Sequence, residues 1–225
     1  MMYEEVIGSE RGSELRKNGS KLLKISFDSE DLDNLFIINH TKFITKNLNL
    51  THLSIDPHKF YMIINKKNTV VKVQYNDDIS THEVIYNPYK YEHSKQENFD
   101  PELFAQKYNV PNGYIDTLSK WYSIKFTYPD HNLIFIKPEM GISIQIHSQR
   151  SEKWEILAGK PIIINGNNVW YYVENIYKFV NGINMYHCVI NPNKDPEAFV
   201  EIREEWSGKF DEKDIIRVYN PNNYI

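Results

Sequence analysis

The chain has 225 residues, with 26 basic and 30 acidic side chains, a formal net charge of −4 and a pI of about 6.1. Its 41% hydrophobic and 14% aromatic residues are enough to bury a core, which excludes a disordered chain. The near-neutral charge gives no electrostatic reason to expect a nucleic acid as partner. The single cysteine, Cys188, excludes an internal disulfide and a cysteine-rich zinc site.

No apolar run approaches the ~20 residues that a membrane helix needs. The first twenty residues are polar and lack the apolar core of a secretory signal. We therefore expect a cytoplasmic protein with no membrane partner.

Short runs of β-branched and aromatic residues, separated by polar turns, predict a mainly β protein. Residues 1–21 are interrupted by glycine and serine, and we expect a mobile arm there. Residues 22–120 form a strand-rich region with two short helices near its end, at 101–108 and 114–121. Asp100 before Pro101 is typical of a capped helix start. Strands resume over residues 121–225, which we expect to form the second domain.

The second domain contains a hairpin with unusual polar positions. Alternation from Ile142 to His147 places Gln145 and His147 on one face of a strand, and Glu152 follows on the returning strand. A third strand carries His187. Two imidazoles, a carboxylate and an amide oxygen that converge from three strands are donors suited to Zn, Mn, Fe or Co. The other six histidines show no ligand spacing, and we interpret them as structural or solvated.

These residues belong to a longer pattern: Gln145-x-His147-x-x-Arg150-x-Glu152-x-Trp154, then Gly159, Asn165-Gly166 and His187-x-x-x-Asn191-Pro192, with an acidic tail over Asp211–Tyr219. Over residues 130–220 the pattern resembles the C-terminal cupin domain of type II phosphomannose isomerases, which is usually fused to mannose-1-phosphate guanylyltransferase. The chain departs from the family where Glu139 follows Pro138 in place of glycine, and where Ser148 and Gln149 replace two histidines.

The resemblance implies a cupin barrel, a double-stranded β-helix or jelly roll, over residues 121–225. It implies one divalent metal, with zinc as first choice, held by Gln145, His147, Glu152 and His187. It also implies interconversion of mannose 6-phosphate and fructose 6-phosphate, a step of carbohydrate metabolism that serves polysaccharide biosynthesis.

Isomerisation requires a proton to move between neighbouring carbons. Glu152 is the obvious carboxylate, and Lys160 is a candidate assistant. Tyr171, Tyr172 and Tyr186 are alternatives. The phosphate group favours a guanidinium, for which Arg150 is the first choice and Arg217 the second. Trp154 is a candidate lining of the sugar pocket, and Cys188 is expected to pack between layers.

Two questions stay open at the level of the sequence. If Gln145 faces inward, then Ile142, Ile144 and Ile146 form an outward apolar stripe that the N-terminal region or a second subunit must cover, so we expect a homodimer. Residues 22–120 are either such a cover or a degenerate second cupin. The alternatives to the isomerase are a non-catalytic sugar-binding or assembly module, an Fe(II) enzyme using a facial triad, and an enzyme of sugar nucleotides.

Overall fold

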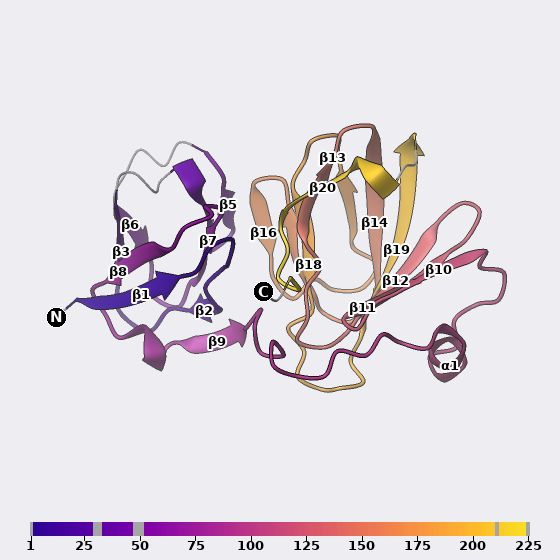
Figure 1. Cartoon of the computed structure of the whole chain (residues 1–225), viewed down its shortest axis with the longest axis horizontal. Helices are drawn as coiled ribbons and strands as arrows, with labels where there is room; N and C mark the ends of the chain where they lie inside the picture. Colours follow the sequence, from indigo (N-terminus) through magenta and orange to yellow (C-terminus); the bar gives the residue numbers. More distant parts are fainter. Residues whose placement is uncertain (1, 29–32, 47–51, 210–211, 224–225) are drawn as a thin grey trace. The chain divides into compact units, whose positions relative to one another are not determined.

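The computed structural model describes residues 2–28, 33–46, 52–209 and 212–223. The chain divides into two compact units. Unit 1 runs to Pro88 and includes residues 167–169, whereas unit 2 comprises residues 89–166 and the chain from Trp170 onward. Most of the described residues lie in strands or turns (Figure 1), which confirms the prediction of a mainly β protein.

Unit 1 is built from two antiparallel sheets. The first has the order β1-β8-β3-β6, with β1 Tyr3–Ile7, β8 Val71–Tyr75, β3 Leu23–Phe27 and β6 His52–Ile55. The second has the order β5-β4-β7-β2-β9, with β5 Lys42–Ile44, β4 Leu35–Asn39, β7 Phe60–Asn65, β2 Leu15–Lys17 and β9 Glu83–Tyr86. A short 3₁₀ helix, Ile79–Thr81, precedes β9. Asn168, at the start of β16 (Asn168–Trp170), pairs with Lys42 of β5.

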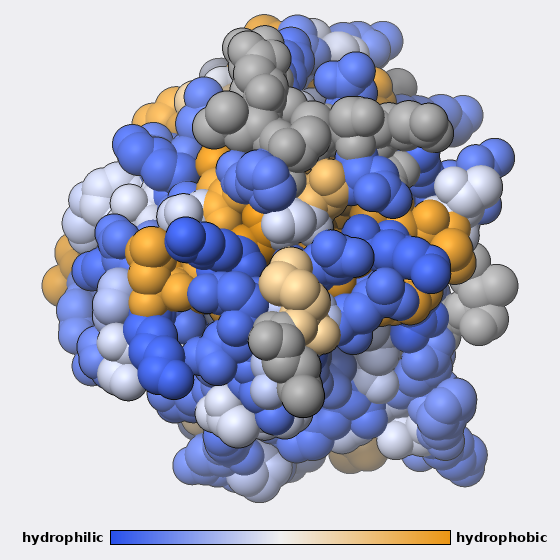
Figure 2. All heavy atoms as spheres, turned by 90° about the vertical axis from the view of Figure 1, so that its left-hand side faces the viewer, coloured by the Kyte–Doolittle hydropathy of each residue, from blue (hydrophilic) through white to orange (hydrophobic). Residues whose placement is uncertain are grey.

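Alternating burial explains the first sheet of unit 1. On β8 the side chains of Val71, Val73 and Tyr75 are buried, whereas Lys72 and Gln74 point outward. The inward residues of both sheets form one apolar core, to which β3 contributes Leu23, Ile25 and Phe27. The outward polar residues make the face of this unit in Figure 2 mostly hydrophilic, with some hydrophobic side chains among them.

Unit 2 also has two antiparallel sheets. One has the order β10-β11-β12-β19-β14-β17, with β10 Asp116–Ser119, β11 Ser123–Thr127, β12 Asn132–Ile136, β19 Val200–Gly208, β14 Arg150–Ala158 and β17 Lys178–Asn181. The other contains β20 Ile215–Tyr219, β13 Ile144–His147, β18 His187–Ile190 and β15 Ile162–Asn165, in this order. Helix α1, Pro101–Lys107, precedes β10, and a 3₁₀ helix, Glu212–Asp214, precedes β20.

The two units share one strand order. Adding eleven to each strand number converts β1-β8-β3-β6 into β12-β19-β14-β17, and β2-β7-β4 into β13-β18-β15. Crossing between two facing sheets in this order is the connectivity of a jelly roll. Unit 1 is therefore a second barrel of the same type, as one of the two predictions for the N-terminal region proposed.

Several sequence-based boundaries need correction. The expected mobile arm over residues 1–21 contains β1 and β2, because partners distant in sequence pair with both strands: β8 with β1, and β7 and β9 with β2. The unit boundary lies after Pro88 rather than at 120, because α1 and β10 belong to unit 2. There, Phe104 of the helix packs with Phe126 and Phe135.

Of the two predicted helices, the first is confirmed as α1. The Asp100 carboxylate accepts a hydrogen bond from the Leu103 amide at 3.0 Å, and Pro101 occupies the first turn. The second predicted helix, 114–121, is wrong, because Asp116–Ser119 pairs with β11 as a strand.

The sequence predicts an outward isoleucine stripe that another part of the molecule covers, and the structure differs from this prediction at Ile142. Ile142 precedes β13 and packs against the apolar core of unit 2, and the side chain of Ile144 is only 2% exposed. None of the helices in the described parts of the chain has the length and apolar composition of a membrane span.

Candidate metal centre and its pocket

Three strands of unit 2 bring the predicted ligands together. Gln145 and His147 lie on β13, Glu152 on β14 and His187 on β18, where Gln145 and His187 are opposite each other in register. The turn between β13 and β14 is held by Asp214, whose carboxylate accepts hydrogen bonds from the amides of Ser148 and Gln149 at 3.1 and 2.9 Å. The acidic tail therefore fixes the hairpin that carries the ligands.

His147, Glu152 and His187 form a compact and buried group. Their ligating atoms all lie within 4.8 Å of one another, and the exposed fractions of the side chains are 2% or less. His147 Nε2 is 3.0 Å from Glu152 Oε1, and His187 Nε2 is 3.6 Å from Glu152 Oε2. The two imidazole rings stack with centroids 5.0 Å apart. Among the described residues this is the one such group of three or more metal-binding side chains.

The donor atoms of this group fit a divalent metal. Glu152 Oε2 is buried and has no hydrogen-bond partner, an expensive state for a carboxylate oxygen unless a cation binds it. His187 Nδ1 lies 2.9 Å from the carbonyl oxygen of Met185, and an N–H donated there leaves the Nε2 lone pair facing the site. If the side-chain amide of Gln145 is flipped, its oxygen faces His187. Its nitrogen then lies next to Ser143 Oγ and can donate a hydrogen bond to that hydroxyl.

The pKa values of Glu152 and His187 favour the protonation states that can bind a cation. Burial would raise the pKa of Glu152, but the hydrogen bond from His147 and the nearby charges of His187 and Arg150 outweigh it and lower the pKa to about 2. Burial lowers the pKa of His187 to about 4 despite the proximity of Glu152. The carboxylate is therefore ionised and the His187 imidazole neutral at pH 7, as metal ligation requires.

Arg150 occupies a different place from the one that the sequence suggested. We expected it at the hairpin tip, ready to bind a phosphate, but its side chain is 3% exposed. Its Nε donates a hydrogen bond to Glu152 Oε1 at 2.9 Å, and its Nη2 lies 3.5 Å from His147 Nε2. The guanidinium therefore neutralises Glu152 beside the metal group.

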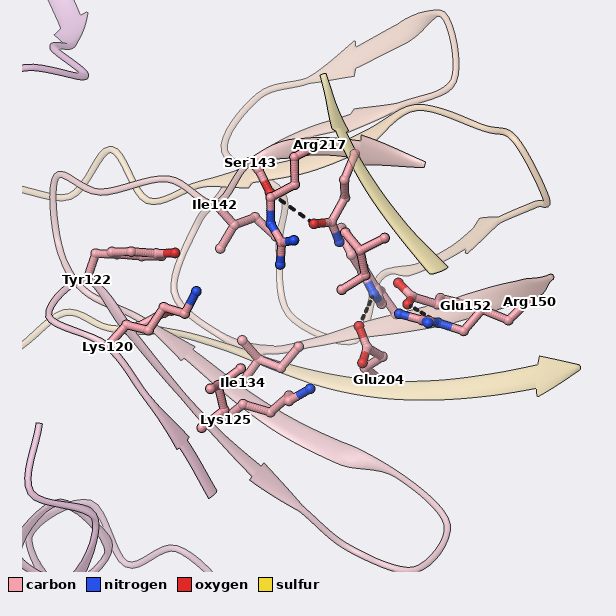
Figure 3. A pocket seen from close by; sticks show the side chains of 15 residues that line it. Lys120, Tyr122, Lys125, Ile134, Ile142, Ser143, Arg150, Glu152, Glu204 and Arg217 are labelled. Atoms are coloured by element: carbon pink, nitrogen blue, oxygen red, sulfur yellow. Dashed lines mark hydrogen bonds and ion pairs between the residues drawn. The ribbon is translucent and has the colours of Figure 1, made fainter. Parts of the chain in front are cut away.

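A pocket opens beside this group (Figure 3). Glu152, Arg150 and Gln145 form part of its lining, and Trp154 and Glu204 form another part. The side chains of three cations extend into the same space: Lys120, Lys125 and Arg217. The remaining lining is Leu118, Tyr122, Ser123, Ile134, Ile142, Ser143 and Ile215.

Most of the predicted site residues therefore lie together, and one does not. Arg217 and Trp154 both line the pocket, although Trp154 is 1% exposed and its indole N–H donates a hydrogen bond to Glu204. Lys160 is 58% exposed and pairs with Glu174 at 2.9 Å outside the pocket, so the structure gives it no contact with the site. Cys188 is buried and its thiol donates to the carbonyl of Ile142, which agrees with a packing role.

Sequence reasoning missed Lys120, Lys125 and Glu204. Glu204 had a usable signal, because it continues the inward alternation of Val200 and Ile202 on β19. The two lysines had none, because their convergence with Arg217 depends on the pairing of β10, β11 and β12.

The fold and the buried group define unit 2 as a cupin barrel with a buried candidate metal centre. Residues 109–220 match the family described as "Mannose-6-phosphate isomerase C-terminal". Unit 2 of this chain thus belongs, through these residues, to the family of C-terminal domains of mannose-6-phosphate isomerases.

The curated relatives of this chain include mannose-1-phosphate guanylyltransferases. Mannose-1-phosphate guanylyltransferase ManC of Salmonella typhimurium is 33% identical over 85 residues, which are 37% of this chain and 17% of the relative. A mannose-1-phosphate guanylyltransferase of Salmonella montevideo is 25% identical over 199 residues, 84% of this chain and 35% of the relative. The chain thus spans at most about a third of the length of these two proteins.

Among solved structures, the capsular polysaccharide assembling protein CapF from Staphylococcus aureus matches with a TM-score of 0.38 and 16% identity, over 51% of this chain and 34% of that one.

Proposed function

We propose that the chain is a metal-dependent sugar-phosphate isomerase that interconverts mannose 6-phosphate and fructose 6-phosphate. The observation that carries the proposal is the buried Glu152 carboxylate, which faces one imidazole with each oxygen, has no hydrogen bond to Oε2 and lies next to a pocket with three cations. The family of residues 109–220 supports the choice of reaction.

The metal would be held by His147, His187 and Glu152, with the Gln145 amide oxygen as a fourth donor. We propose zinc, since two imidazoles and a carboxylate are common zinc ligands, with manganese, iron and cobalt as alternatives. When bound, such a metal polarises a carbonyl oxygen and stabilises the negative charge that develops on it.

We assign the phosphate group to Lys120, Lys125 and Arg217 rather than to Arg150. Arg217 is exposed and faces the pocket, and the two lysines are only half-buried, so all three can meet a ligand from solvent. Arg150 is enclosed and already bound to Glu152. A phosphate dianion at the rim would place the carbons of the sugar between the cations and the metal group.

The first test is the metal content of the purified protein, with and without reconstitution by Zn²⁺, Mn²⁺, Fe²⁺ or Co²⁺. It is combined with a coupled assay for mannose 6-phosphate isomerisation. We expect one equivalent of metal and turnover in the wild type, and loss of both in His187→Ala. The matched control is His82→Ala, a buried histidine of unit 1 that should leave metal content unchanged.

Metal without turnover would retain the site but overturn the isomerase, and other sugar phosphates or sugar nucleotides would be tested next. A protein that binds no metal would overturn the catalytic proposal and leave a binding module.

One contact favours that second candidate function, a metal-free sugar-binding or assembly module. The Arg150 guanidinium already supplies a positive charge to Glu152 at 2.9 Å and approaches His147. A cation in this place can stabilise the buried carboxylate without any metal. The homodimer that the sequence predicts remains a proposal for either candidate, and sedimentation of the purified chain checks it.

A further inference from the structure

A second buried carboxylate, Glu204, borders the same pocket. It lies on β19, opposite Trp154 of β14 and opposite Asn132 of β12, and its side chain is 6% exposed. It lines the pocket together with Glu152 (Figure 3). Glu204 is neither one of the proposed metal ligands nor one of the residues that we assign to the phosphate group.

Two neutral donors hold the carboxylate in place. Asn132 Nδ2 donates to Oε1 at 2.8 Å, and Trp154 Nε1 donates to Oε2 at 3.0 Å. Within the described parts of the chain no salt bridge shorter than 4.0 Å joins Glu204 to a cation, in contrast to Glu152 with its arginine and two histidines. Its oxygens are thus fixed in direction, but its charge is not neutralised by an ion pair.

Burial of this carboxylate destabilises the folded protein. Burying an acid without an ion pair destabilises the charged form, and an apolar side chain at this inward position would extend the core begun by Val200 and Ile202. The carboxylate is retained where the fold opens into a pocket, which is where an acid-base group is useful.

The surroundings of Glu204 suit a group that takes up and returns a proton. Burial, and after it the charge of Glu152, raise the pKa of Glu204, whereas the hydrogen bond from Asn132 and the charge of Lys125 on β11 oppose this effect. Lys120, Arg150 and Arg217 are the other charged groups of the pocket. A carboxyl group that is fixed by two neutral donors at the pocket can take up and return a proton without breaking an ion pair.

We propose that Glu204 is the catalytic residue that transfers the proton between C2 and C1 of the sugar phosphate; this rests on the isomerase proposed above. The carboxylate removes the proton from C2 of the open-chain aldose. The C–H electron pair forms the C1–C2 double bond, and the carbonyl π pair moves to O1. The O2 proton then passes to O1 while the ketone forms at C2, and Glu204 returns its proton to C1 to give the ketose.

The other candidates are less suitable for this step. Glu152 directs its two oxygens toward His147 and His187, where they serve as ligands. Lys160 lies outside the pocket. Glu204 is thus the carboxylate of the pocket that is left for proton transfer.

The experiment compares Glu204→Gln with Glu205→Gln, the adjacent glutamate, which is 42% exposed and pairs with Lys153 and Arg203. Each metal-loaded protein is incubated with mannose 6-phosphate in D₂O, and deuterium at C1 and C2 is followed by NMR beside the coupled assay. Removal of a general base costs about 10²- to 10⁴-fold in rate. We expect this loss in turnover and in exchange for Glu204→Gln, with unchanged metal content, and wild-type behaviour for Glu205→Gln.

Turnover of Glu204→Gln within about threefold of the wild type would overturn the assignment of Glu204 and leave the isomerase intact. A metal-loaded wild type that shows neither turnover nor exchange would overturn the isomerase and this assignment together. If Glu204→Gln does not fold, Glu204→Asp tests the proposal instead. This variant keeps the carboxyl group but shortens the side chain by one methylene, which moves the acid away from the substrate. At least a tenfold loss with metal retained supports the proposal, and full activity overturns it.

Discussion

The two barrels of the chain have the same strand order but different polar interiors. In unit 2, β13 and β18 place Gln145 opposite His187. In unit 1 the corresponding strands, β2 and β7, place Arg16 opposite Tyr61. Arg16 pairs with Glu5 and Glu14 at 3.1 and 3.0 Å, so an arginine neutralises the carboxylates of this barrel.

The comparison teaches that the strand order does not by itself create the site. Both barrels bury alternating Ile, Leu, Val and aromatic residues, and this apolar pattern sets the fold. The chemistry depends on the few polar side chains that replace apolar ones at the same strand positions. Unit 2 leaves Glu152 Oε2 without a hydrogen-bond partner, whereas in unit 1 Glu5 binds both Arg16 and the hydroxyl of Tyr75.

The arginines provide the largest expected effect and the sharpest test of the comparison. We predict that Arg150→Met destabilises metal-free unit 2 by about 3 kcal/mol, because it leaves Glu152 buried beside imidazoles alone. Zn²⁺ should recover much of this loss, since the metal binds the same carboxylate. All four tryptophans, Trp121, Trp154, Trp170 and Trp206, lie in unit 2, so denaturant unfolding followed by tryptophan fluorescence reports on that unit.

The matched variant in unit 1 is Arg16→Met, whose destabilisation should not respond to zinc. It is followed by far-UV circular dichroism, because unit 1 has no tryptophan. Equal destabilisation of Arg150→Met with and without zinc would show that Arg150 and the metal do not share Glu152.

Acid should act on metal-free unit 2 through the same group, with a smaller effect. His187 has a pKa of about 4 in the folded protein and about 6.5 unfolded, so between these values only the unfolded chain binds the proton. Stability therefore falls as the pH is lowered from 6.5 to 4. The pKa of Glu152 is lowered from 4.5 to about 2, so its contribution is lost as the pH falls through that lower range.

Tryptophan-detected denaturation midpoints at pH 7 and pH 5 check this prediction. His187→Gln cannot titrate and should reduce the difference between the two midpoints. An unchanged difference in this variant would assign the acid sensitivity to other groups.

How much of this could be predicted from the sequence differs between the fold and the site. The convergence of the proposed ligands was predictable, because Gln145, His147 and Glu152 lie on a local hairpin whose alternation fixes their face. Strands β1 and β2 were not, since β2 has only three residues and depends on β7 and β9, which lie far along the chain. The inward direction of the Arg150 side chain could not be predicted from the sequence, because a residue next to a turn is usually solvated.

The smallest predicted effect concerns the rim of the pocket, where the barrels differ again. Arg16 of unit 1 is 11% exposed and paired with two carboxylates, so it has no charge left for a ligand. Lys120, Lys125 and Arg217 of unit 2 face a pocket that opens to solvent. We predict that Arg217→Ala and Lys125→Ala each raise KM for mannose 6-phosphate about tenfold, or about 1.4 kcal/mol, with little change in metal content.

Lys160→Ala is the control, because this lysine pairs with Glu174 away from the pocket and should leave KM unchanged. The KM increase should shrink as ionic strength rises, because salt screens the attraction between exposed cations and a phosphate. Unphosphorylated mannose separates the two explanations of a change in KM, since the rim variants should not alter its binding. If they weaken mannose and mannose 6-phosphate alike, the rim shapes the pocket, and the phosphate is recognised by other residues of the barrel.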